Sequence, residues 1–161
     1  MKRDVRWIGL TVLLAVPQSH AAAAAASPGA CAVLKAHAEA VLEATADLTS
    51  GTGSHPGQAD AAGCVIAFKG TGEVFGTRFQ VVAARLDAMM VAQGWTQDIN
   101  AAADGPTGSA MGYRKGSQAV AVSVDYDTPS GVCRDDAPVA SCHPTAAQMI
   151  YSITLGLTPA S

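Results

Sequence analysis

Four cysteines lie behind an N-terminal stretch that resembles an export signal, and this combination constrains the fold most strongly. They are Cys31, Cys64, Cys133 and Cys142 in a chain of 161 residues. An even number of cysteines in an exported chain predicts disulfides rather than free thiols. Of the three possible pairings we favour Cys133–Cys142, which closes a short loop, and therefore Cys31–Cys64. Each bridge is expected to contribute about 2–4 kcal/mol of stability.

The N-terminus has the parts of a Sec-type signal. Basic residues within 2–6 precede an apolar run over 7–16, and small residues follow at 19–21. Ten residues at about 1.5 Å each are too short to cross about 30 Å of hydrocarbon. We therefore predict a signal peptide over 1–21, with a cleavage site between 21 and 26. An alanine-rich leader predicted to be disordered follows over 22–30, and a single domain spans 31–158.

These features predict a periplasmic or secreted protein. The alternative is a lipoprotein acylated at Cys31, but Pro28 stands where such a signal has an aliphatic residue, so we expect no stable membrane anchor. The net charge of −3 and the pI near 5.7 argue against a nucleic-acid binder. A basic footprint would be expected of that class.

Apolar residues at three-and-four spacing predict two helices. The first covers 31–48, with Cys31 on its buried side. The second runs from about 78 to 93, with Thr77 as N-cap, Gly94 just past its end and Trp95 packing back on the last turn. The apolar stripe of the second helix consists of Phe79, Val82, Leu86, Met89 and Met90.

The remaining segments predict strands and turns. A buried strand is expected over 64–68, an alternating strand from 95, a hairpin from 109–114 and 118–126, and a last strand over 148–157. The stretch 49–63 has no periodicity and predicts a loop. This order indicates an α+β fold: a two-layer sandwich, a mostly antiparallel sheet of about five strands with two helices on one face.

Three motifs suggest chemistry at first sight, and each departs from its template. Gly70-x-Gly72-x-x-x-Gly76 is not the G-x-G-x-x-G of dinucleotide sites, and we expect no cofactor. The stretch 107–112 fails as a nucleophile elbow because Thr107 replaces its first glycine. Adjacent Ser54 and His55 do not by adjacency form a nucleophile and base. We therefore predict no catalytic residue.

The polar loop after the hairpin is the candidate metal site. Its possible ligands are Asp125, Asp127, Asp135, Asp136 and His143. Oxygen-rich loops can hold Ca²⁺, but the glycine and closing glutamate of a calcium loop are absent. A zinc site from Cys133, Cys142 and His143 lacks the usual ligand spacing, so disulfide pairing is favoured.

The stretch from Gly94-Trp95 through Asp104-Gly105-Pro106 to Lys115-Gly116 resembles a class of small exported bacterial proteins of unknown function. In these a helix ending in Gly-Trp leads to an aspartate-glycine turn and a β-meander. The resemblance supports the helix-to-meander order and implies no catalytic residue, because a fold plan does not specify an activity.

Two functions follow as hypotheses. The first is a non-catalytic binding or interaction module stapled by two disulfides, with Tyr113, Arg114 and Tyr126 as candidate contacts to an envelope protein or small ligand. The second is a small exported hydrolase or metal-dependent enzyme that uses the acidic loop 125–143. The acidic composition excludes nucleic acid as the partner of either.

Overall fold

The computed structural model describes residues 26–53, 61–133 and 141–160. The predicted signal peptide, residues 22–25 of the leader, Ser54, His55, Asp135 and Asp136 lie outside these residues. The helices are α1 (Pro28–Leu42), α2 (Gly72–Phe75) and α3 (Phe79–Ala92), with a 3-10 turn, η2 (Ala146–Gln148). The strands are β1 (Asp47–Gly53), β2 (Ala61–Thr71), β3 (Thr96–Asp104), β4 (Gly108–Lys115), β5 (Gln118–Asp127) and β6 (Ile150–Pro159).

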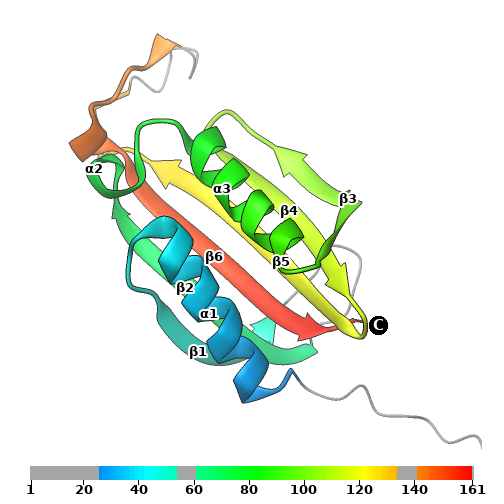
Figure 1. Ribbon diagram of the computed structural model, residues 1–161. Coiled ribbons are helices and arrows are strands. Elements are labelled where there is room, and N and C mark those ends of the chain that lie inside the picture. The colour runs from blue at the N-terminus through cyan, green and yellow to red at the C-terminus, as the bar shows by residue number, and fades with distance from the viewer. Residues whose placement is uncertain (1–25, 54–60, 134–140, 161) are drawn as a thin grey trace, which may run out of the picture.

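The six strands form one antiparallel sheet in the order β1-β2-β6-β5-β4-β3. The last strand, β6, lies in the middle of the sheet, between β2 and β5. The helices α1 and α3 cross the same face of this sheet and run in opposite directions (Figure 1). The predicted α+β two-layer arrangement is confirmed, with six strands in place of about five.

The first helix is displaced from its predicted bounds. It begins at Pro28, whose fixed backbone angle suits the first helical turn, and Ser27 caps it by accepting a hydrogen bond from the backbone N–H of Ala30. It ends at Leu42 because Glu43 adopts the left-handed conformation. Residues 28–30 therefore belong to the helix, and the prediction that they are part of a disordered leader is wrong.

Strand β1 replaces the end of that predicted helix and the start of the predicted loop. Its sequence is Asp-Leu-Thr-Ser-Gly-Thr-Gly, which has no apolar alternation. It pairs with β2 in register from Asp47↔Ala67 to Gly53↔Ala61. Because β1 is an edge strand, pairing along one side suffices to hold it without a large buried side chain. This strand accounts for the sixth position in the sheet.

The second predicted helix is confirmed as α3, and so is its end. Gly94 has φ of 78°, and the backbone N–H of Trp95 bonds the carbonyl of Met90 at 3.0 Å. That six-to-one bond is the Schellman ending. Its start differs from the prediction, because Arg78 rather than Thr77 is the N-cap and makes no side-chain cap bond.

Both predicted disulfides are confirmed. Cys31–Cys64 joins α1 to β2 beneath the helix, and both residues are only 4% exposed. Cys133–Cys142 closes a short loop between β5 and β6, with both residues half-buried. The first bridge therefore fastens the two layers together, whereas the second constrains a connection outside the core.

Candidate functional site

Helix α3 is apolar on two opposite faces. Its inner face packs on the sheet through Phe79, Val82, Ala83, Leu86, Met89 and Met90, all buried. Its outer face carries Val81, Ala84, Ala88 and Val91, all exposed, at the 3-4-3 spacing of a helical stripe. The valines at the ends of this outer stripe are 43% and 56% exposed. A helix that faces only water on its outer side normally carries polar residues there.

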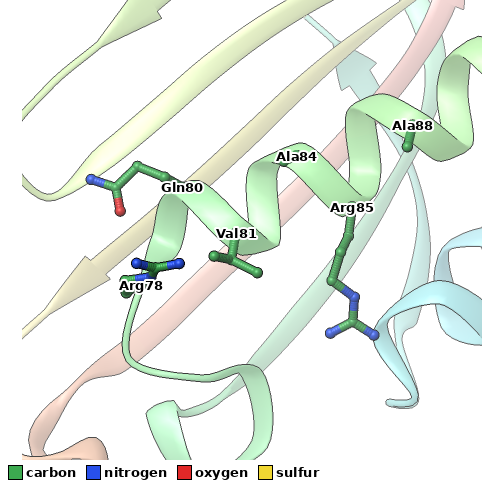
Figure 2. Close-up of a pocket in the computed structure, with 6 residues that line it drawn as sticks. All are labelled: Arg78, Gln80, Val81, Ala84, Arg85 and Ala88. Atoms are coloured by element: carbon green, nitrogen blue, oxygen red, sulfur yellow. The ribbon is translucent and has the colours of Figure 1, made fainter.

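Two arginines flank the outer stripe on one side. Arg78 and Arg85 are seven residues, or two turns, apart and therefore lie on the same flank of α3. They border a hollow of about 720 Å³ that Val81, Ala84, Ala88 and Gln80 also line. Figure 2 shows Arg78, Val81 and Arg85 extending to the same side of the helix, with Gln80 directed away. No carboxylate is among the described residues that line this hollow.

Arg85 also fixes the flank to the neighbouring helix. Its guanidinium donates a hydrogen bond to the backbone carbonyl of Val41 near the end of α1. The side chain of Arg78 is exposed and makes no hydrogen bond or ion pair to another described residue. Arg85 thus has a structural role besides its positive charge. The exposed guanidinium of Arg78 can bind an anionic group.

The outer face of α1 continues the apolar surface. It consists of small residues, all exposed: Ala32, Val33, Ala36 and Ala40. The ion pair on α1 joins Lys35 to Glu39 at 2.6 Å. It lies on a less exposed side of the helix, where both residues are half-buried. This bond and the backbone N–H of Ala46 hold the pKa of the Glu39 carboxyl below its usual value. The outer surface of the two helices therefore consists mostly of small apolar side chains. Its positive charge comes from Arg78 and Arg85 along α3.

The predicted partner-binding residue Tyr113 is not on the surface. It lies on the helix-facing side of β4, is fully buried, and donates a hydrogen bond to Asp87 Oδ1 at 2.7 Å. Burial and the neighbouring carboxylate raise the pKa of its hydroxyl above the usual range. Tyr113 is therefore not available as the predicted contact to a partner, because alternation along the strand directs this side chain into the core.

The other two predicted contacts lie apart from each other. Arg114 is on the opposite, helix-free face of the sheet, where its Nε pairs with Asp98 Oδ2 at 3.0 Å. Tyr126 is half-buried at one end of the core and its ring lies 6.0 Å from that of Phe79. The structure therefore does not bring Tyr113, Arg114 and Tyr126 together in one surface site.

The residues considered for catalysis form no Ser-His-Asp arrangement in the described part of the chain. Ser109 is 9% exposed, and its hydroxyl donates to Asp104 Oδ1 at 2.6 Å. Both border a hollow of about 400 Å³ near the start of α3, and none of its described lining residues is a histidine. This pair lacks the histidine that accepts the serine proton in a Ser-His-Asp triad.

Of the candidate metal ligands, the structure describes Asp125, Asp127 and His143. Asp125 lies on the helix-free face of β5, where the Ser123 hydroxyl donates to it, and Asp127 accepts a bond from the backbone N–H of Thr128. His143 is exposed beyond the Cys133–Cys142 loop. Within the described ranges no group of three or more His, Cys, Asp or Glu side chains could hold a metal ion.

The outer stripe of α3 has a signal in the sequence that the prediction of a single apolar stripe overlooks. Only Gln80, Arg85 and Asp87 are polar among the fourteen residues of this helix. The predicted stripe from Phe79 to Met90 contains only residues of the core-facing side. It includes none of the apolar residues on the opposite side of the helix. A helix that is apolar nearly all round predicts contacts on both sides.

Comparison with protein-family models, curated proteins and solved structures finds no match to this chain. Among the helices that the structure describes, none is long and apolar enough to span a membrane.

Proposed function

We propose that this protein is an exported, non-catalytic interaction module whose helix layer docks an acidic amphipathic helix of a partner protein. The observation that carries the proposal is the second apolar face of α3, exposed from Val81 to Val91 and bordered by Arg78 and Arg85. Two disulfides support a protein that works in an oxidising compartment, the periplasm or the exterior.

The stripe has the dimensions of a helix-binding surface. Val81 and Val91 are ten residue steps apart, or about 15 Å along the axis, at 1.5 Å per step. An amphipathic helix recognises such a surface through apolar residues at three-and-four spacing. Because Ala84 and Ala88 are small, a partner backbone can approach α3 closely between the two valines. We expect a partner segment of about three turns.

Charge defines the partner further. The flank contains two guanidinium groups and no described carboxylate, so a partner helix with glutamates or aspartates on one edge forms complementary pairs. A second copy fits less well. In an antiparallel pairing of two copies of α3, symmetry places the arginine flank of one against the arginine flank of the other. Like charges then oppose this pairing, which favours a different chain as the occupant.

A pair of designed peptides tests the proposal. Each has fourteen residues with the same alanine and leucine stripe, and the edge that meets Arg78 and Arg85 carries glutamates in one peptide and lysines in the other. Titration is followed by backbone amide NMR of the full chain at low salt. We expect the glutamate peptide to shift the amides of α3 with micromolar to millimolar affinity, the range of a small interface, and the lysine peptide to bind at least tenfold more weakly.

Matched valine variants separate the docking surface from general surface charge. Val91→Glu places a carboxylate in the stripe, whereas Val74→Glu places one at an equally exposed valine on α2, 55% against 56% exposed. Only Val91→Glu should weaken binding, by about tenfold or more. Equal binding of both peptides, no binding at millimolar concentration, or a dimer in sedimentation that buries α3 would each contradict the proposed partner.

A further inference from the structure

A narrow cleft opens at the far end of the helix layer from Arg78, where the start of α1 meets the end of α3. Its volume is about 110 Å³. The lining comes from α1, the end of α3, the β4–β5 turn and β6, so the walls converge from four parts of the fold. The lining residues are Ala30, Val33, Leu34, His37, Gln93, Trp95, Lys115, Gln118 and Leu157.

The floor of the cleft is apolar and its rim is polar. Leu34 and Leu157 are core residues, 4% and 1% exposed, so the cleft reaches down to the hydrophobic core. Around the rim stand the imidazole of His37, the ammonium of Lys115 and the amide of Gln118. None of the described residues that line the cleft is an aspartate or glutamate. An anion therefore meets donors here and no opposing charge.

The position of Lys115 is fixed by two contacts. Its Nζ donates to the backbone carbonyl of Gln93 at 2.6 Å and lies 5.9 Å from the centre of the Trp95 ring. An ammonium has three protons, so at least one remains for a ligand after the bond to Gln93. The first turn of α1, which contributes Ala30, adds the positive end of a helix dipole to the same wall.

We infer that this cleft binds a small monocarboxylate with a short apolar tail. The carboxylate would be held at the rim by Lys115 and Gln118, and the tail would lie on the indole of Trp95 and on Leu34 and Leu157. A water in the liquid occupies about 30 Å³, so 110 Å³ holds about four waters. That is room for an acid of about four carbons. The inference does not rest on helix docking, because the docking stripe and the cleft share no residue.

Butyrate and its neutral isostere butyramide test the ligand class. Each is titrated into the full chain at constant ionic strength, and the ring N–H of Trp95 and the ring protons of His37 are followed by NMR. A Trp95→Phe variant assigns the indole signal, because the chain also contains Trp7. We expect saturable shifts with butyrate and at least tenfold weaker binding of butyramide. Equal affinities, or no shift with 100 mM butyrate, would overturn the inference.

Variants identify the cleft as the site. Lys115→Met keeps the stem of the side chain and removes the charge, and we expect it to weaken butyrate binding about tenfold or more. Ala30→Leu fills the cleft without a change of charge and should abolish binding. Lys69→Met, at an exposed lysine on the helix-free face of β2, is the matched control and should leave binding unchanged. Retention of wild-type affinity in Lys115→Met or Ala30→Leu, with the amide spectrum preserved, would show that butyrate binds elsewhere.

Discussion

Arg85 of α3 donates a hydrogen bond from its guanidinium to the backbone carbonyl of Val41 in the last turn of α1. The last four carbonyls of a helix have no partner within it, and a positive charge beside them is favourable. Arg85, on the flank of α3, therefore provides a hydrogen-bond donor to a carbonyl at the C-terminal end of α1. The same side chain sets the spacing of α1 and α3 and forms part of the cationic flank proposed for docking.

The first prediction separates the two arginines. Arg85→Met should lower the free energy of unfolding by about 1–2 kcal/mol, because it removes a charged hydrogen bond at a half-buried site. Arg78→Met removes no described partner and should change it by less than about 0.5 kcal/mol. Both should weaken binding of the glutamate peptide. Urea unfolding measures the first effect, and a similar loss of stability in both variants would disprove the structural role of Arg85.

The second prediction concerns the order in which the disulfides are reduced. Cys31–Cys64 is buried between layers, whereas Cys133–Cys142 is half-buried in a connecting loop. A mild dithiol should therefore reduce Cys133–Cys142 first, as alkylation and peptide mass spectrometry would show. Replacing the pair by alanines should cost about 3 kcal/mol for Cys133–Cys142 and about 4 kcal/mol for Cys31–Cys64, because the longer loop restricts the unfolded chain more.

The third prediction uses two glycines that face each other across β1 and β2, Gly51 and Gly63. A Cβ on Gly63 would lie 1.9 Å from the carbonyl oxygen of Leu157, which is a severe overlap with backbone. A Cβ on Gly51 would lie 3.5 Å from the side chain of Val65, an ordinary contact. Gly63→Ala should therefore separate β2 from β6 and destabilise the fold by more than about 3 kcal/mol, while Gly51→Ala stays within about 1 kcal/mol. Thermal unfolding of the two variants compares them directly, and equal melting temperatures would refute the close approach.

Local chemistry made part of this fold predictable. The end of α3 could be located because Gly94 and Trp95 form a Schellman motif. This motif needs a positive φ, which few residues other than glycine adopt. The hairpin of β4 and β5 could be located because alternation and the Lys115-Gly116 turn agree. Strand β1 could not, because an edge strand of Gly, Ser and Thr is stabilised by its partner strand rather than by its own side chains.

The candidate sites depend on which face each residue occupies, and that required the tertiary structure. Tyr113 and Arg114 are neighbours in sequence but point to opposite faces of the sheet. The cleft around Lys115 brings together residues as distant as Ala30 and Leu157. The spacing of residues within one segment cannot predict that side chains from distant segments meet in one cleft. The outer stripe of α3 was readable in the sequence, but its exposure was decided only by how α3 packs.

The last prediction concerns Tyr151, whose hydroxyl is buried without a hydrogen-bond partner among the described residues. An unsatisfied buried hydroxyl costs about 1–3 kcal/mol, and its ring contributes packing against Phe75 at 5.6 Å and Tyr126 at 5.9 Å. Tyr151→Phe keeps the ring and removes the hydroxyl. We expect the free energy of unfolding at neutral pH to rise by about 1 kcal/mol. Tyr113→Phe should instead lower it by about 1 kcal/mol, since it removes the bond to Asp87.

The response of Tyr151→Phe to alkali provides a second, independent measurement. Burial, followed by the proximity of Tyr126, raises the pKa of Tyr151 to about 12, against about 10 in an unfolded chain. Between these values the unfolded state loses its proton while the folded state retains it. Stability therefore falls as pH rises, by up to about 1.4 kcal/mol per pH unit from this residue. Tyr151→Phe should lose less stability than the unmodified protein between pH 10 and 12, as urea unfolding across that range would show, and parallel losses in the two proteins would mean that the Tyr151 hydroxyl reaches water.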